Sequence, residues 1–536
     1  MFQSARSLKY AAAFLAAAAI ILGTACTGDD DGGTSTPASS GGSPRPSVSL
    51  GTTIDLAATA DLTAYAAEDA TDLVNVGNSM ALGDFNDDGV PDALIGAPQA
   101  DGPDNAREDG GEAYIMFGPL DESRPLGGGD ADITLFGAAA GDGLASISLA
   151  GDMNDDGVDD IIVGAPGVTA GFDPRSDQGR AYVFYGGEDI GDNSELDLAE
   201  DIFDATVTGA EGFSRLGHAM DLGDVNADGT QDLVIGAPFA GRKPGTPPGG
   251  ERTALGEVYV VYGSDGLNGE RNIARDEFDV LLSGAVAFGQ FGASLGVGDV
   301  NGDGADDIVV GAYRSNPEGQ GSTPGGAFVF MGAPDLEGRL SVQEGDQDAT
   351  IVGPDSSSFG FPLAVADFNG DEKDDMAFGA QLQTSGTLER QGAVHLILGS
   401  EDLEDEINVG DAASFTVTGS ITGELFPSAL GAADIDGDGA ADLIAGSSLA
   451  GQTDRPGAGV VHVFTRLGSA PASFDLSKDV APITVLGEAA DDRLGGAVAG
   501  GALADERRGL LLLAVQASSG NGDDGTGVVY VVPVGE

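Results

Sequence analysis

The stretch GDVNADGTQDLVIGAP, residues 223–238, decides the fold of this 536-residue chain. Asp224, Asn226, Asp228 and Asp232 fall within nine residues of it, and the apolar run Leu233, Val234 and Ile235 follows directly. Carboxylates crowded into one loop repel one another unless a cation lies among them. The apolar run has the length of a buried strand. The stretch therefore predicts a cation-binding loop that leads into a strand.

The same pattern occurs six times, and this repetition dominates the sequence. The segments are LGDFNDDGVPDALIGAP from residue 82, AGDMNDDGVDDIIVGAP from 150, LGDVNADGTQDLVIGAP from 222, VGDVNGDGADDIVVGAY from 297, VADFNGDEKDDMAFGAQ from 365 and AADIDGDGAADLIAGSS from 432. Their leading Asp residues are 68, 72, 75, 68 and 67 residues apart. A seventh unit, RLGGAVAGGALADERRGLLLLAVQAS from residue 493, keeps the flanking strands but lacks the acidic loop.

Each unit has the pattern of four short strands in about 70 residues, which is typical of a β-propeller blade. We therefore predict an all-β, seven-bladed β-propeller over residues 53–533. Its approximate blades are 77–136, 144–209, 216–284, 291–353, 359–419, 426–487 and 494–533. Residues 53–67 are expected to supply the fourth strand of the last blade, which closes the ring and hides its edge strands.

The FG…DxNxDGxxD…GAP pattern resembles the FG-GAP repeats that build the seven-bladed propeller of integrin α subunits and of related bacterial proteins. The resemblance covers residues 53–533 and rests on six loops in phase. It implies that the calcium loops lie on one face of the propeller. The loops between the GAP motif and the third strand then lie on the opposite face, which usually carries the binding function.

The acidic loops have the ligand spacing of a calcium site. Oxygen ligands at loop positions one, three and five, a backbone carbonyl at seven and a carboxylate at nine can surround a hard cation, and glycine at six allows the sharp turn. Position twelve is not glutamate and both flanks are strands, so the loops are not EF-hands. The candidate Ca2+ ligands are Asp84, Asn86, Asp88, Val90, Asp92, Asp152, Asn154, Asp156, Val158, Asp160, Asp224, Asn226, Asp228, Thr230, Asp232, Asp299, Asn301, Asp303, Ala305, Asp307, Asp367, Asn369, Asp371, Lys373, Asp375, Asp434, Asp436, Asp438, Ala440 and Asp442.

We expect about six calcium sites of unequal strength. The loop from Asp367 to Asp375 is expected to be the weakest, because Glu372 stands where the other loops have glycine. The sixth loop gains a carboxylate at Asp436 and is expected to bind more tightly. Two alternatives stand beside this interpretation: Asp, Asn and Gly favour turns without any ion, and a bound ion could be catalytic. Because the same residues recur at the same loop positions six times, we favour calcium over turns without an ion. Because every candidate ligand is needed to surround the ion, we favour a structural ion over a catalytic one.

The charge of the chain excludes several partners. It has 88 Asp plus Glu against 23 Lys plus Arg, and such a surface repels nucleic acids and anionic lipid headgroups. Some of the acidic residues are explained as calcium ligands. Others would be explained by an acidic, well-hydrated surface of the kind that suits a salty habitat.

The N-terminal region has the features of a bacterial export signal. Residues 1–25 carry Arg6 and Lys9 before a short apolar stretch, AAAFLAAAAIIL, which is too short to span a membrane comfortably. Cys26, the single cysteine, resembles the lipidated residue of a bacterial lipobox; the alternative is an ordinary cleavage site. Residues 27–50 read as a flexible tether rich in Gly, Ser, Thr and Pro. We expect secretion across the inner membrane, and a cell-envelope, outer-membrane or cell-surface lipoprotein whose only membrane contact is the lipid anchor.

The loops that follow the GAP motif carry an unusual share of the basic residues. Arg107, Arg175, Arg252 and Arg455 each stand four residues before the glycine that opens the third strand, and Arg390 stands two before it. One interpretation is a ring of guanidinium groups for a carboxylate- or sulfate-bearing ligand. The other is a repeated structural tie to a neighbouring carboxylate.

The sequence contains no GxSxG, Walker or HExxH motif. We therefore expect a surface binding or adhesion module, and not an enzyme. Its ligand would be a protein or an acidic glycan on the face opposite the calcium loops. The alternatives are a calcium-dependent propeller lyase or dehydratase, and an envelope scaffold lipoprotein.

Overall fold

The computed structural model describes residues 52–59, 63–66, 76–126, 129–167, 178–200, 202–210, 213–241, 254–264, 267–316, 324–502, 508–515 and 527–535. Cys26, Arg175 and Arg252 lie outside these residues, as do the expected leader and tether. Within the ranges given, no helix combines the length and the apolar character that a membrane crossing needs.

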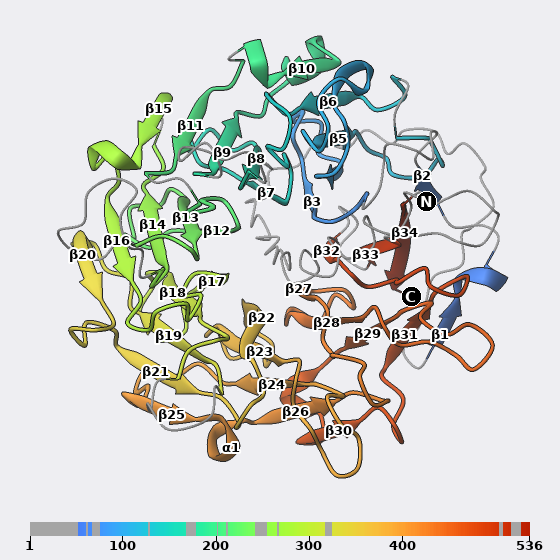
Figure 1. Ribbon diagram of the computed structural model, residues 1–536. Coiled ribbons are helices and arrows are strands. Elements are labelled where there is room, and N and C mark those ends of the chain that lie inside the picture. Colours follow the sequence, from blue (N-terminus) through green and yellow to red (C-terminus); the bar gives the residue numbers. More distant parts are fainter. Residues whose placement is uncertain are drawn as a thin grey trace, which may run out of the picture.

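The described strands form seven sheets arranged radially around a central axis, so the predicted seven-bladed β-propeller is confirmed (Figure 1). The first strand of each sheet lies innermost. These strands are β3 (Met80–Gly83), β7 (Ile147–Gly151), β12 (Ala219–Gly223), β17 (Ser294–Gly298), β22 (Phe359–Ala366), β27 (Leu430–Ala433) and β32 (Val498–Ala502).

The second and third strands follow in antiparallel order and form the centre of each blade. The second strands are β4 (Asp92–Ala97), β8 (Asp160–Ala165), β13 (Asp232–Ala237), β18 (Asp307–Gly311), β23 (Asp375–Ala380), β28 (Asp442–Ser447) and β33 (Arg508–Val515). The third strands are β5 (Glu112–Met116), β9 (Arg180–Phe184), β14 (Glu257–Val261), β19 (Gly326–Phe330), β24 (Ala393–Ile397), β29 (Val460–Phe464) and β34 (Val528–Gly535). Every residue of β4, β8 and β13 is buried. Each sheet packs between two neighbours, which explains why these strands are apolar on both faces.

The fourth strands complete the predicted blades. They are β6 (Ile133–Phe136), β11 (Ala205–Thr208), β16 (Val280–Ser283), β21 (Ala349–Val352), β26 (Phe415–Thr418), β31 (Ile483–Leu486) and β2 (Thr63–Ala66). The one α-helix of the described residues, α1 (Val409–Ala412), precedes β26.

A short fifth strand, which the sequence analysis did not predict, covers the outer edge of six sheets. These strands are β10 (Glu195–Asp197), β15 (Gly269–Asn272), β20 (Gly338–Ser341), β25 (Glu406–Asn408), β30 (Ser473–Asp475) and β1 (Thr52–Asp55). Each pairs in parallel with the fourth strand of the preceding blade, as β10 does with β6. An Asp or Asn side chain then turns the chain back: Asp197 accepts from the Ala199 N–H at 2.9 Å and Asn272 from the Ala274 N–H at 3.0 Å. Neighbouring blades are thereby hydrogen-bonded to one another.

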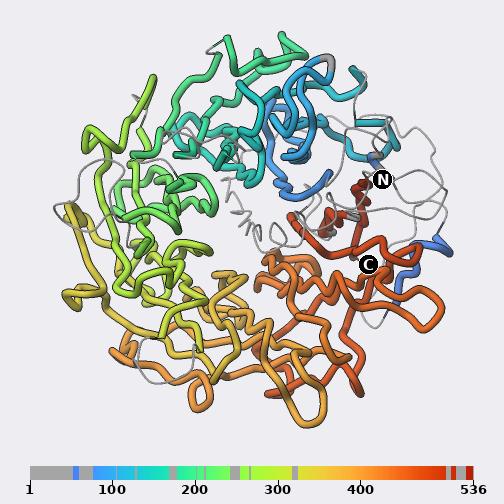
Figure 2. The backbone as a smooth tube through the Cα atoms, in the orientation of Figure 1, coloured from blue at the N-terminus to red at the C-terminus, as the bar shows by residue number. Residues whose placement is uncertain are grey.

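The N-terminal segment closes the ring with two strands, where we expected one. β1 pairs in parallel with β31 of the sixth blade, and β2 pairs in antiparallel order with β34 of the seventh. In Figure 2 the blue N-terminal tube accordingly lies against the red C-terminal part of the chain. The expectation that residues 53–67 are a single fourth strand was therefore wrong in one respect. The turn at Leu56–Ala58, which Asp55 caps through the Ala57 N–H at 3.1 Å, divides the segment.

Candidate functional site

The six acidic loops join the first and second strands of six blades and share one hydrogen-bond pattern. In the third loop, the Asp228 and Gly229 N–H groups donate to the two carboxylate oxygens of Asp224 at 2.9 and 2.8 Å. The Thr230 N–H donates to Asp228 Oδ1 at 3.0 Å. The same three bonds occur in the other five loops. The side chains at positions one and five are therefore held toward the inside of every loop.

The fifth loop keeps this pattern although it has no glycine at position six. Glu372 adopts φ of 68°, and its N–H donates to Asp367 Oδ2 at 2.8 Å. The equivalent Gly229 has φ of 95°. A side chain in this left-handed region is unfavourable, so the fifth loop reaches the common turn at a conformational cost. That this site is the weakest stays a prediction.

The position-nine carboxylates are completely buried. They are Asp92, Asp160, Asp232, Asp307, Asp375 and Asp442. In the third loop, Asp232 accepts from the Val225 N–H at 3.1 Å and from the Gly263 N–H at 3.0 Å, which ties the loop to the turn after the third strand. Burial raises the pKa of these carboxyls to about 7 in five loops and to about 8 at Asp442. Their charged form is therefore unfavourable unless a cation is close.

The residues of these loops fit calcium. Their donors are all oxygens, which a hard cation prefers. At the candidate ligand positions, three buried side-chain oxygens have no hydrogen-bond partner, namely Asn226 Oδ1, Asp436 Oδ1 and Asp442 Oδ1. Buried polar atoms rarely stay without a partner, and a bound ion would supply one. The side chains at positions one, three, five and nine and the carbonyl at seven would hold it.

Position eight of the loops has a role that the sequence analysis missed. Asp159, Asp306 and Asp374 each accept from the N–H of the position-one Asp in the preceding blade, at 2.9, 2.8 and 2.9 Å. The Asp-Asp pairs at 159–160, 306–307 and 374–375 were the available signal. These bonds connect consecutive loops around the axis.

Two of the arginines that were candidates for ligand binding instead contact aspartates at the ends of fifth strands. Arg107 contacts both carboxylate oxygens of Asp197, at 2.6 and 2.7 Å, and Arg455 contacts both oxygens of Asp55, at 2.7 Å each. Each guanidinium also donates to the glycine carbonyl that follows the fourth strand of its blade. Hydrogen bonding to the arginines holds the pKa of Asp55 and Asp197 below its usual value. The geometry favours the structural tie at Arg107 and Arg455.

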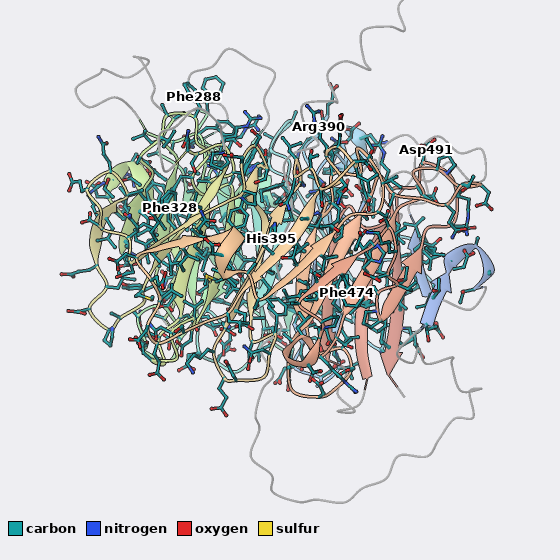
Figure 3. The ribbon with its side chains drawn as sticks, turned by 90° about the horizontal axis from the view of Figure 1, so that it is seen from below. Phe288, Phe328, Arg390, His395, Phe474 and Asp491 are labelled. Atoms are coloured by element: carbon teal, nitrogen blue, oxygen red, sulfur yellow. The ribbon has the colours of Figure 1, made fainter. Side chains whose placement is uncertain are left out.

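The opposite face carries exposed aromatic and basic side chains (Figure 3). Phe288 is 63% exposed and Phe213 is 47% exposed. Both have positive φ, 59° and 66°, which is rare for bulky residues. Arg390 is exposed, and the exposed Arg314 stacks on Tyr313 with 5.4 Å between the guanidinium carbon and the ring centroid. These groups can contact a ligand that has both apolar and anionic parts.

The resemblance to FG-GAP repeats, which was inferred from the repeated sequence pattern, is confirmed by a family model. The FG-GAP repeat model matches residues 76–116, 144–184, 216–261, 291–329 and 426–464. This chain carries FG-GAP repeats. Each matched FG-GAP segment contains one acidic loop with its two flanking strands. The fifth acidic loop, with Glu372, lies outside the matched segments.

Curated relatives match this chain over part of their length. Human phosphatidylinositol-glycan-specific phospholipase D is 35% identical over 211 residues, which are 39% of this chain and 23% of that protein. Integrin alpha pat-2 of Caenorhabditis briggsae is 32% identical over 45% of this chain and 18% of its own. Integrin alpha-5 of Xenopus laevis is 29% identical over 50% of this chain and 22% of its own. The chain thus spans about a quarter or less of these relatives.

Among solved structures, rhamnogalacturonan lyase YesW superposes with a TM-score of 0.35 and 13% identity, covering 79% of this chain and 60% of that chain.

Replacement of the arginine ties should destabilise the FG-GAP propeller without unfolding it. We expect Arg107→Ala and Arg455→Ala each to cost about 1.5–3 kcal/mol, the range for hydrogen bonds to a charged partner. Both arginine side chains are largely buried, with 21% and 15% exposure. The pKa values of the partner carboxyls are lower in the folded protein than in the unfolded chain. The contribution of these contacts to the free energy of unfolding is therefore complete above the pKa of the unfolded chain, and it is lost as the pH falls through the pKa of the folded protein. Urea midpoints at pH 7 and pH 3 measure it.

Arg455→Lys is the matched variant, because it keeps the charge and loses the two-pronged contact. It should recover only part of the loss. An Arg455→Ala protein with the parent midpoint would contradict the structural tie.

Proposed function

We propose that this chain is a calcium-loaded propeller whose acidic loops are structural and whose opposite face binds a protein or acidic-glycan ligand. The observation that carries the proposal is the set of six loops with one hydrogen-bond pattern and a buried carboxylate at position nine. Calcium would neutralise carboxylates that repel one another and would fix the loop between two strands. Every candidate ligand surrounds the ion, so the proposal gives calcium no reaction to perform.

The ligand class is inferred from charge. The chain has a formal net charge of −65, which disfavours anions in general. Against that background, Arg314 and Arg390 are both exposed, and the Arg314 N–H donates to the carbonyl of Gly289, next to the exposed Phe288. Guanidinium groups recognise carboxylate and sulfate well, and aromatic rings pack on apolar ligand faces. We therefore infer a ligand with acidic and apolar surfaces.

The proposal also includes the location inferred from the sequence. Lipidation at Cys26 would hold the propeller at a bacterial envelope, and residues 27–50 would separate it from the membrane. Metabolic labelling with a fatty-acid analogue, compared between the parent and Cys26→Ser, tests this part directly.

Binding to immobilised alginate, polygalacturonate and heparin tests the ligand class. We expect retention of the parent protein and at least about tenfold weaker binding for Arg314→Gln with Arg390→Gln, because one lost ionic hydrogen bond is worth about tenfold or more. Arg275→Gln with Arg339→Gln is the matched control, since it removes the same charge from exposed positions at the outer strands. Equal loss in the control, or no retention of the parent, would contradict an acidic-glycan site. New unsaturated products would instead identify a lyase.

The calcium-free protein should be more stable at pH 5.5 than at pH 8. The position-nine carboxyls have raised pKa values of about 7 to 8 in the folded chain, against an ordinary value of 3.8. Between these values the folded chain binds more protons than the unfolded chain, so a falling pH stabilises the fold. Bound calcium requires ionised ligands and should reverse the order. Melting curves in calcium-depleted buffer across this range measure it; a calcium-free protein that loses stability steadily from pH 8 to 5.5 would contradict the assignment.

A further inference from the structure

The turn beside the sixth acidic loop differs from its five equivalents. In five blades an apolar residue and a glycine directly follow the third strand, for example Tyr262-Gly263 after β14. In the sixth blade Thr465 and Arg466 come between β29 and the corresponding pair, Leu467-Gly468. The insertion places an arginine next to the loop of carboxylates.

The insertion removes a hydrogen bond from the buried carboxylate of the loop. In the other five blades the turn glycine donates its N–H to the position-nine carboxylate, at 2.7, 2.9, 3.0, 2.8 and 2.9 Å. In the sixth blade Asp442 Oδ2 accepts from the Ile435 and Asp436 N–H groups at 2.8 and 3.2 Å. Its Oδ1 has no hydrogen-bond partner although Asp442 is completely buried. This oxygen is therefore available to an ion.

The Asp442 carboxylate lies close to two other carboxylates of the same loop. Asp434, Asp436 and Asp442 each offer a carboxylate oxygen, and these oxygens lie within 4.8 Å of one another. In the parts of the chain that the structure describes, this is the one such group of three acidic side chains. Asp436 contributes the additional carboxylate, because the other five loops have asparagine at position three. The sixth loop thus has four carboxylates at its side-chain ligand positions, where each of the other five loops has three.

Arg466 already occupies part of this site. Its Nε lies 3.1 Å from Asp436 Oδ2 and 3.5 Å from Asp438 Oδ2. The Arg466 backbone has φ of 59°, an unfavourable conformation for a residue with a side chain. Asp436 is 9% exposed at its side chain, but Arg466 is 55% exposed. The arginine can therefore leave the loop for solvent while the carboxylates stay in place.

We propose that Arg466 competes with the cation for Asp436 and Asp438, which makes the sixth loop an exchangeable calcium site. The proposal rests on the calcium-binding role inferred above and deepens it. One guanidinium cancels the charge of the additional carboxylate, so the loop has no charge advantage over the others while Arg466 is bound. An ion entering the loop must displace Arg466, which lowers its affinity. This reverses the order expected from the sequence, in which the additional carboxylate made the sixth site tighter.

Calcium titration of the full chain tests the competition. The protein is stripped of metal, and binding of radioactive Ca2+ is followed by equilibrium dialysis in parent, Arg466→Gln and Arg339→Gln proteins. Arg339 also forms an arginine–aspartate pair, with Asp276 at 2.6 Å, but it lies away from the acidic loops, so its variant controls for net charge. We expect Arg466→Gln to keep the number of bound ions and to tighten one site about tenfold or more. Arg339→Gln should match the parent.

A second variant keeps the inference falsifiable. Asp436→Asn gives the sixth loop the ligand set of the others while Arg466 still faces Asp438, so one site should weaken. If Arg466→Gln and Arg339→Gln give the same isotherm, or if Asp436→Asn leaves every site unchanged, the competition is overturned and the calcium-binding role stands. If the parent binds no calcium, both are overturned. Circular dichroism in calcium checks that each variant is folded.

Discussion

Removal of calcium should lower the melting temperature of this propeller by about 15 °C. An ion that binds only the folded state at a hundred times its Kd contributes about 2.7 kcal/mol, so six sites contribute on the order of 16 kcal/mol. Unfolding entropy is about 2 cal/mol/K per residue, or roughly 1 kcal/mol/K for a propeller of about 480 residues. The ratio of the two gives the expected shift. Calorimetry in saturating calcium and after chelation measures it.

Re-addition of metals provides the control for this experiment. Calcium should restore the melting temperature at lower concentration than magnesium, because the loops offer many flexible oxygen ligands and magnesium needs a near-ideal octahedron. Asp232→Asn should remove about one sixth of the effect, since it changes one loop. An unchanged melting temperature after chelation would show that the acidic loops are turns and not ion sites.

Deletion of residues 52–66 should open the ring. The sixth sheet would lose β1 together with the Asp55 partner of Arg455, and the seventh would lose β2 with the completely buried Tyr65. Loss of a large buried aromatic costs about 3–5 kcal/mol, and loss of the ionic contact costs about 1.5–3 kcal/mol. We expect a melting temperature lower by about 5–8 °C and self-association through the exposed edge of β34. Calorimetry and size-exclusion chromatography measure the two effects.

The deleted segment can be returned as a separate peptide. A synthetic peptide of residues 52–66 should bind the truncated protein and reduce its self-association, whereas a peptide with Tyr65→Ala and Asp55→Ala should not. A truncated protein that melts like the parent and stays monomeric would contradict closure by this segment.

The sequence allowed the acidic loops and the number of blades to be predicted, because both depend on residue types at fixed spacing. Asp224, Asp228 and Asp232 indicate an ion loop without knowledge of any contact. The fifth strands could not be recognised in this way. β10, Glu195–Asp197, is only three residues long and has a single apolar side chain, Leu196, which is too short a stretch to show a recognisable apolar alternation. The available signal was a recurrent Asp or Asn followed by an apolar residue, as in Asp55-Leu56 and Asp197-Leu198.

The partners of the arginines could not be predicted for a different reason. Arg455 and Asp55 are 400 residues apart and meet only because the ring closes. The position of Arg455 showed that an interaction repeats, but not whether a ligand or another strand receives it. At Arg466 the inserted residues were visible in the sequence, yet their effect on Asp442 depends on a hydrogen bond that is visible only in three dimensions.

The division of the N-terminal segment between two blades determines how the propeller would carry a mechanical load. If residues 27–50 are the tether proposed above, tension along them would reach the described part of the chain at Thr52, the first residue of β1. β1 is held by four paired residues of β31 and by Arg455. Only after these contacts break would the force reach β2 and the seam of the ring at β34. The first strand would therefore separate first, so that a pull on the proposed tether would break contacts at the rim before it loads the ring itself.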